Sequence, residues 1–164
     1  MQPPRIFFVR CPSEVKSGAE LATLEERVAA ARGLMRDPKV AISDIEAQIG
    51  ARYTYDTLRW LTRRAPGVRF VWIMGADNLI GFHRWRRWRD IADLAPILVV
   101  DRPGSTLRAL SSPAAVALAR FRRPEREALR FARLEPPAIL FLHGPRSDLS
   151  STALRRAAAR DGLS

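Results

Sequence analysis

FVWIMGADNLIGFHRWRRWRDIADLAPILVVDRPG, residues 70–104, is the stretch of this chain that decides the fold. Two apolar runs, Phe70–Met74 and Ile97–Val100, flank a segment that contains Trp85 and Trp88. Continuous apolar runs are typical of strands covered on both faces, so the pattern predicts a parallel strand–helix–strand unit. A glycine and a charged residue follow each run closely. Ligands bind outside the carboxyl ends of such strands, so a site is expected there, although most of these loops are only polar turns.

The rest of the chain alternates in the same way. Strands are expected at Ile6–Val9, Val40–Ile45 and Ala138–Leu142. Helices are expected over residues 23–35, from an N-cap at Thr54 to Pro66, over 105–135 with breaks at Pro113 and Pro124, and after a cap at Ser150 and Ser151. Alternating strands and helices predict an α/β protein with a doubly wound parallel sheet. The length of 164 residues predicts one domain spanning residues 1–164.

Composition narrows the class of protein. No apolar run reaches the length of about 18 residues that a transmembrane helix needs. The first residues lack the basic start and small-residue cleavage site of a signal peptide. The single cysteine, Cys11, excludes an internal disulfide framework and has no Cys/His cluster around it that would bind a metal. A reducing, cytoplasmic location is therefore expected, with no membrane partner.

The net charge of +11 makes nucleic acid a possible partner. Of the 28 lysines and arginines, only Lys16 and Lys39 are lysines, and the arginines are scattered among acidic residues over several expected helices. This distribution indicates a bias of composition more than a nucleic-acid surface, although basic surfaces attract phosphates in general. Polymeric nucleic acid is thus the disfavoured partner.

The closing segment contains a second chemical cluster. Ser150 and Ser151 stand at the expected start of the last helix, and Arg155 follows one turn later. Backbone N–H groups and the helix dipole make such a start an anion site, to which an arginine can add a bidentate contact. An ordinary hydroxyl cap with a solvated arginine is the alternative.

Four motifs together resemble those of the nicotinate-nucleotide adenylyltransferase family, within the HxGH nucleotidyltransferases. Arg52–Leu58 is similar to its Y-T-x-x-T-L segment, and Phe70–Trp88 to its strand, Gly-x-Asp turn and F-x-x-W-x-x-W sequence. Asp101–Gly104 is similar to its R-P-G turn, and Ser150–Arg155 to its S-S-T-x-[IL]-R motif. Each motif is weak alone, but their order and spacing agree over nearly the whole chain.

The resemblance implies a Rossmann-like nucleotidyltransferase fold and a reaction of NAD biosynthesis. ATP would transfer its adenylyl group to nicotinate mononucleotide, giving the deamido dinucleotide and pyrophosphate. Mg²⁺ would accompany ATP. The motifs leave open whether nicotinate or nicotinamide mononucleotide is preferred.

For the mononucleotide, the resemblance implies that Trp85 stacks on the pyridine ring, a role that suits a flat aromatic face. Thr54 and the backbone of Tyr55 would receive the carboxylate, and Lys16 would lie near the phosphates. A core position on an amphipathic helix is the alternative for Trp85, and it is our preferred interpretation for Trp88.

For ATP, the resemblance implies that Gly75 allows close backbone approach and that Asp77 accepts a hydrogen bond from a ribose hydroxyl. The remaining residues of the ATP side would be Arg102, Ser150, Ser151 and Arg155.

One departure from the family concerns catalysis. Its first strand, turn and helix carry G-G-x-F-[DN]-P-x-H-x-G-H, whose histidines hold the ATP phosphates, and the 164 residues contain no such motif. The only histidines, His83 and His143, cannot be mapped onto it, so no catalytic residue is identified. The fold is therefore expected to lack its first strand and helix, which leaves the edges of Ile6–Val9 and Phe70–Met74 unpaired.

Three hypotheses follow. We favour an adenylyltransferase whose first segment is encoded upstream of Met1, behind a misplaced start. A truncated relative that binds pyridine nucleotides without catalysis is the second, and a basic nucleic-acid-binding α/β protein is the third. Upstream sequence encoding the histidine motif would separate the first two, and arginines grouped on one surface would be needed for the third.

Overall fold

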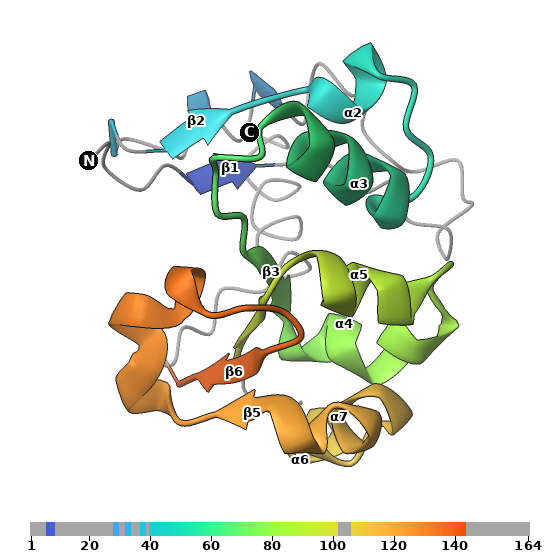
Figure 1. Ribbon diagram of the computed structural model, residues 1–164, viewed down its shortest axis with the longest axis vertical. Coiled ribbons are helices and arrows are strands. Elements are labelled where there is room, and N and C mark those ends of the chain that lie inside the picture. Colours follow the sequence, from blue (N-terminus) through green and yellow to red (C-terminus); the bar gives the residue numbers. More distant parts are fainter. Residues whose placement is uncertain are drawn as a thin grey trace, which may run out of the picture. The chain divides into compact units, whose positions relative to one another are not determined.

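The structure is a computed structural model that describes residues 6–8, 28–29, 32–33, 37–38, 40–101 and 106–143 (Figure 1). Its contacts divide the chain into two compact units, Met1–Ala65 and Pro66–Ser164, each of which is described by itself. The single domain expected from the chain length stays a prediction.

The first unit contains a two-stranded parallel sheet. Strand β1 (Ile6–Phe8) pairs with β2 (Val40–Ile42) over three residues each. The expected strand Val40–Ile45 is too long, because a short helix, α2 (Ile45–Gln48), begins where the strand was expected to continue. The hydroxyl of Ser43 accepts a hydrogen bond from the backbone N–H of Ile45 at 3.2 Å. Such a local side-chain bond competes with strand pairing and turns the chain.

Two helical pieces of the first unit can be compared with the expectations. Residues 28–29 and 32–33 are helical, in agreement with the helix expected over 23–35. Helix α3 (Thr54–Arg64) ends just before Pro66, as predicted. The predicted N-cap is wrong by one residue: Tyr53, whose backbone is extended, occupies that position, and Thr54 is the first helical residue.

A buried polar contact connects α2 to α3. The hydroxyl of Thr57 donates to a carboxylate oxygen of Glu46 at 3.2 Å, and the two residues are only 1% and 5% exposed. A buried carboxylate is costly to desolvate unless it accepts hydrogen bonds. The Thr57 hydroxyl therefore contributes to holding α2 against the start of α3.

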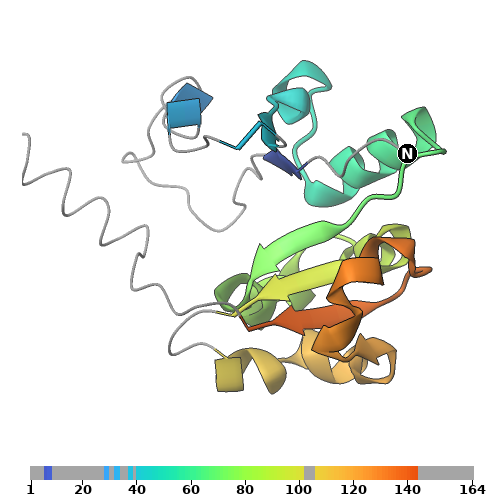
Figure 2. The ribbon, with the colours of Figure 1, turned by 90° about the vertical axis from the view of Figure 1, so that its left-hand side faces the viewer.

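The second unit is built on a parallel sheet of four strands. Strand β4 (Ile97–Val100) is the expected one, and β3 (Trp72–Gly75) begins two residues later and ends one residue later than the expected run Phe70–Met74. Next in the sheet come β6 (Ile139–Leu142), also expected, and then β5 (Arg122–Arg123). Figure 2 shows β3, β4 and β6 running in the same direction. Sequence reasoning missed β5, because two exposed arginines show no apolar pattern.

The connection from β3 to β4 is helical, as expected, but it is not one helix. Helix α4 (Ala76–Gly81) continues into a 3-10 turn, η1 (Phe82–Arg84), and α5 (Trp88–Leu94) follows after a break. Arg87 adopts the left-handed conformation at the break, with φ 56°. A turn therefore separates the two tryptophans.

The stretch expected to be helical over 105–135 is a series of short elements, broken near both prolines. Pro113 begins α7, and Pro124 immediately precedes the last segment. The elements are α6 (Thr106–Leu110), α7 (Pro113–Ala117), η2 (Ala119–Phe121), β5 and η3 (Glu125–Arg133).

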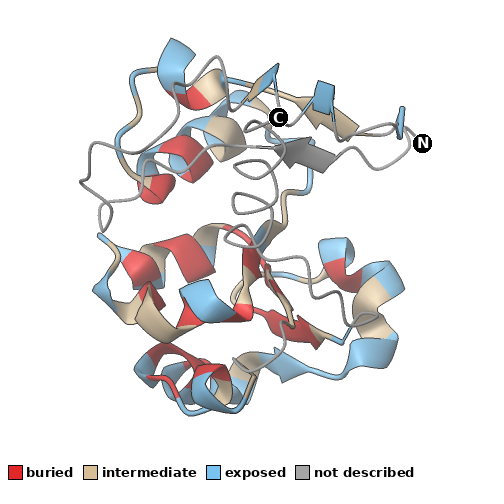
Figure 3. Cartoon of the chain, turned by 180° about the vertical axis from the view of Figure 1, so that it is seen from behind, coloured by how far each residue is buried: buried red, intermediate tan, exposed pale blue. Residues whose placement is uncertain are grey.

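Both faces of the central strands are covered, which is the reason for their continuous apolar runs. On one face, Phe131 of η3 packs with Leu140, and Leu98 joins this cluster. Ile97 and Val99 alternate with Leu98 and are fully buried on the face that α4 contacts. Buried residues gather on these strands and the neighbouring helices (Figure 3).

Each unit has a strand with an edge that no other described strand covers. Among the described strands, β1 pairs only with β2, and β3 pairs on one side with β4. The side chain of Ile73 in β3 is 44% exposed, whereas those of Ile97 and Val99 in the central strand β4 are fully buried. These two open edges, on β1 and β3, agree with the expectation that Ile6–Val9 and Phe70–Met74 would each have an unpaired edge.

A surface pair connects η3 to the end of β6. The carboxylate of Glu125 accepts hydrogen bonds from the backbone N–H and from Nδ1 of His143, both at 3.0 Å. These two bonds, the side-chain bond foremost, lower the pKa of Glu125 below its ordinary value. The carboxylate therefore stabilises the fold only while it is ionised.

We predict that Thr57→Val lowers the free energy of unfolding by about 1–3 kcal/mol, because a buried carboxylate loses a donor. The measurement is urea denaturation. Thr62→Val is the matched control: the Thr62 hydroxyl donates to helix carbonyls, and its loss should change stability by less than about 0.5 kcal/mol. Equal losses for the two variants would contradict the role assigned to the buried bond.

A second prediction concerns pH. Because the folded pKa of Glu125 is depressed below 4.5, its contribution is present above that value and is lost as the pH falls through the folded pKa. Wild type should thus be more stable than Glu125→Gln at about pH 7, and the difference should shrink as the pH falls below 4.5 and through the lowered pKa of the folded state. Urea denaturation across this range is the measurement, and a constant difference would refute a stabilising role for the ionised carboxylate.

Candidate active site

The carboxyl ends of three strands form one edge of the second unit. Gly75 is in register with Val100, and Val100 with Leu142, so the last residues of β3, β4 and β6 form one row. The backbone N–H of Asp101 donates to the carbonyl of Leu142 at 3.0 Å and extends the pairing beyond β4. Adjacent strands are about 4.8 Å apart, so the row is about 10 Å long. It is the edge at which parallel α/β sheets bind ligands.

Two predicted ATP-binding residues lie at the β3 end of this row. Gly75 ends β3 and is the N-cap of α4, with φ −74° and ψ 154°, a conformation that any residue can adopt. Its predicted role therefore depends on space for a ligand and not on backbone freedom. Asp77 lies in the first turn of α4 and is exposed.

Trp85 lies outside both neighbouring helices. Its backbone is extended after η1, and its ring packs edge-on against Phe82 and Trp72, with centroid distances of 5.4 Å and 6.5 Å. Trp85 is partly exposed, whereas Trp88 is buried at 9% exposure and contacts Phe82. The core position preferred for Trp88 is confirmed.

The turn after Trp85 is closed by a hydrogen bond from the N–H of Trp88 to the carbonyl of Trp85 at 3.2 Å. Arg87 supplies the left-handed residue of this turn, and its Nε lies 2.8 Å from a carboxylate oxygen of Asp90. Arginine gains nothing intrinsically from this conformation, which costs about 1–2 kcal/mol for residues with a Cβ. Trp85 therefore lies between the end of η1 and this turn, and the turn leads into α5.

Two buried side-chain nitrogens belong to residues near Trp85. His83 precedes Trp85 by two positions in the sequence, and the ring of Trp72 contacts the ring of Trp85. Within the described ranges, Nε1 of Trp72 and Nδ1 of His83 are buried and make no hydrogen bond. Sequence reasoning did not single out Trp72, because a tryptophan inside an apolar strand has no distinguishing pattern. Its ring contact with Trp85 appears only in the tertiary structure.

The predicted carboxylate-binding residues belong to the first unit. Thr54 and Tyr55 form the first turn of α3 and are 6% and 8% exposed. The guanidinium of Arg59 lies 5.9 Å from the centre of the Tyr55 ring. Gly75, Asp77 and Trp85 belong to the second unit, so the joint pocket of all five residues stays a prediction.

The other five predicted residues lie outside the described part of the chain. Asp101, which directly precedes one of them, accepts a hydrogen bond from the hydroxyl of Thr106 at the start of α6. The residues outside are Lys16, Arg102, Ser150, Ser151 and Arg155.

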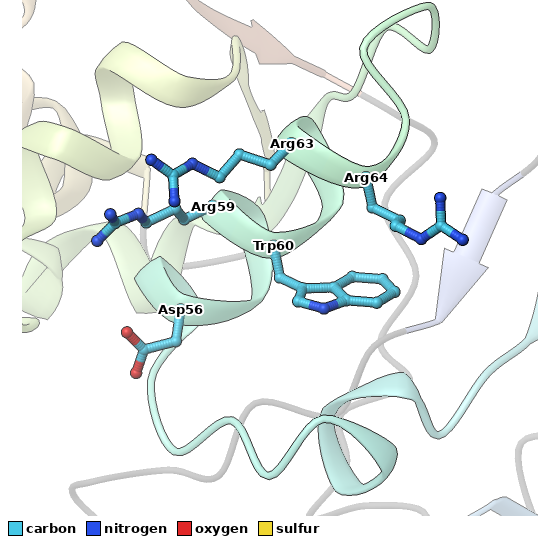
Figure 4. Close-up of a pocket in the computed structure, with 5 residues that line it drawn as sticks. All are labelled: Asp56, Arg59, Trp60, Arg63 and Arg64. Carbon is cyan, nitrogen blue, oxygen red and sulfur yellow. The ribbon is translucent and has the colours of Figure 1, made fainter.

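A shallow hollow of about 320 Å³ lies along the exposed face of α3 (Figure 4). Figure 4 shows Arg59 and Arg63 projecting to one side of the helix, and Trp60 and Arg64 to the other. Asp56 is the fifth lining residue. None of the predicted site residues lines this hollow, and one helix supplies all its walls.

The described residues contain neither a metal-binding cluster nor a membrane-spanning helix. There, no three His, Cys, Asp or Glu side chains are grouped so that they could hold a metal ion. In the same residues, no helix is both long enough and apolar enough to cross a membrane.

Comparisons with known proteins identify relatives over nearly the whole chain. The family described as cytidylyltransferase-like matches residues 2–157. A probable nicotinate-nucleotide adenylyltransferase of Methylorubrum extorquens is 55% identical over 152 residues, 92% of this chain and 82% of the relative. A protein of the same description from a Bradyrhizobium species is 50% identical over 156 residues, 94% and 81% of the two chains.

A solved structure shows the same fold. It is Plasmodium falciparum nicotinic acid mononucleotide adenylyltransferase complexed with APC, with a TM-score of 0.59 and 14% identity. The match covers 93% of this chain and 68% of that one. The expected Rossmann-like nucleotidyltransferase fold is thus confirmed. The family model and the sequence relatives show that the chain belongs to the cytidylyltransferase-like family and, within it, to the nicotinate-nucleotide adenylyltransferases.

Proposed function

We propose that this chain transfers the adenylyl group of ATP to nicotinate mononucleotide in NAD biosynthesis. An oxygen of the mononucleotide 5′-phosphate attacks the α-phosphorus of ATP, and the bond from that phosphorus to the bridging oxygen breaks. The products are the deamido dinucleotide and pyrophosphate. The observation that carries the proposal is the identity of 50–55% over more than nine tenths of the chain with probable nicotinate-nucleotide adenylyltransferases.

The mononucleotide is assigned to Trp85 and the start of α3. Trp85 is partly exposed, and a turn places it outside the helices, which suits a ring that stacks on a ligand. Thr54 and the Tyr55 backbone, in the first turn of α3, would receive the nicotinate carboxylate, since helix starts favour anions. Lys16 would lie near the phosphates.

ATP is assigned to the carboxyl edge of the second sheet. Gly75 would let the nucleotide approach the backbone, and exposed Asp77 would accept a hydrogen bond from a ribose hydroxyl. Mg²⁺ would enter on the ATP phosphates, since it usually keeps several waters and binds through substrate oxygens. The phosphates are assigned to Arg102, Ser150, Ser151 and Arg155.

We assign residues 1–164 to a single nucleotidyltransferase-like domain in the cytoplasm. One cysteine in the whole chain suits that reducing compartment.

The stacking role of Trp85 predicts that Trp85→Ala weakens binding of nicotinate mononucleotide by about 1–3 kcal/mol. Isothermal titration calorimetry is the measurement, with thermal unfolding of the same preparations. Melting should change little, because the ring is only partly buried.

Two variants serve as controls for Trp85. Trp60→Ala removes a tryptophan that is 39% exposed outside the proposed site, and it should leave affinity unchanged. Trp88→Ala removes a core ring and should cost about 3–5 kcal/mol of stability. Trp85 would be a core residue if its substitution had the effect of Trp88→Ala and left affinity intact.

The polypeptide of 164 residues should by itself turn over slowly. It contains no HxGH motif, and loss of one donor that stabilises the transition state costs about 10²–10³ in rate. Pyrophosphate release with ATP, Mg²⁺ and nicotinate mononucleotide is the measurement. Joining a relative's strand–turn–helix segment that carries HxGH to the amino terminus should restore turnover. Release at about 1 s⁻¹ or faster without that segment would disprove the requirement.

A further inference from the structure

His143 lies at the ATP edge of the second sheet, although no motif accounts for it. It directly follows Leu142, whose row includes Val100 and Gly75 at the ends of the neighbouring strands. Its side chain is 49% exposed. The imidazole is therefore accessible at the edge to which the ATP-binding residues are assigned.

Glu125 determines which nitrogen of the imidazole carries the hydrogen. One carboxylate oxygen accepts from the backbone N–H of His143, and the other lies 3.0 Å from Nδ1. Because these bonds lower the pKa of Glu125, the carboxyl group is ionised at neutral pH and can only accept. Nδ1 must then be the donor, and in the neutral ring Nε2 has a free lone pair. Within the described part of the molecule, Nε2 makes no hydrogen bond.

An acceptor at this position selects among the groups of a nucleotide. Phosphate oxygens and purine ring nitrogens are themselves acceptors, so they cannot pair with a lone pair on Nε2. The donors of ATP are its ribose hydroxyls, one of which is assigned to Asp77, and the exocyclic amino group of adenine. The other ribose hydroxyl and the amino group remain, and of these two donors only the amino group belongs to the base.

We propose that His143 recognises the base of the nucleotide, with Nε2 accepting a hydrogen bond from the exocyclic amino group of adenine. Glu125 is a positioning residue that fixes the ring and its tautomer. A purine with a carbonyl in place of the amino group would bring two acceptors together and would be rejected. The inference rests on the proposed adenylyl transfer and deepens it.

The test compares ATP with inosine triphosphate, in which a carbonyl replaces the amino group, by calorimetry in the presence of Mg²⁺. Wild type should bind ATP about tenfold more tightly, the effect of one unsatisfied polar group. His143→Asn keeps a donor for Glu125 but has no atom at the Nε2 position, so the two affinities should come within about twofold. Glu125→Ala should give an intermediate ratio, because the tautomer is no longer fixed.

Two controls make the outcomes decisive. Arg126→Ala changes the exposed neighbour of Glu125 and should keep the wild-type ratio. Nicotinate mononucleotide affinity should be unchanged in His143→Asn, which shows that the variant is folded.

Equal losses for both triphosphates, or a parallel loss of mononucleotide affinity, would overturn the inference. If wild type binds ATP and the mononucleotide but does not prefer ATP over inosine triphosphate, only base recognition fails. If wild type binds neither substrate, the proposed function fails as well.

Discussion

The in-register parallel pairing of β3, β4 and β6 is the constraint on which the rest of the second unit depends. Hydrogen bonds continue past the strands at both ends, from Trp72 to the carbonyl of Pro96 and from Asp101 to that of Leu142. A slip of one residue would exchange the two faces of β4, and Ile97 and Val99, which are fully buried, would leave the face that α4 contacts. The same register aligns the three carboxyl ends and so creates the edge at which we place ATP.

The connection between β3 and β4 shows how a local strain can serve a site. A continuous helix would have placed Trp85 and Trp88 on nearly the same face, and both would then be core residues. The helical path ends at Arg84, the backbone of Trp85 is extended, and left-handed Arg87 precedes α5, so that Trp88 lies in the core and Trp85 is partly exposed. Strained residues persist where their surroundings hold them, and here the Asp90 carboxylate and the turn provide that support.

Two polar contacts each connect a pair of elements, one contact in each unit. Glu46 and Thr57 hold the start of α3 in the first unit, beside the residues assigned to the nicotinate carboxylate. Glu125 and His143 hold the end of β6 to the start of η3 in the second. Each contact combines a Glu side chain with a hydrogen-bond donor on a neighbouring element. Both occur where a ligand is proposed, so the same bonds that support the fold also orient the site.

Sequence alone predicted two parallel strands, at Phe70–Met74 and Ile97–Val100, because apolar runs without alternation are typical of strands buried on both faces; the structure places the first at Trp72–Gly75. It also determined the family, since four motifs occur in the right order. Tertiary structure alone decided the exposed position of Trp85 and the bond between Glu125 and His143, which are 18 residues apart. The position of Trp85 depends on the break in the helical backbone between η1 and α5. The bond between Glu125 and His143 depends on two segments distant in the sequence meeting in the fold. Neither feature produces a periodic pattern of apolar and polar residues, so the sequence could not predict it.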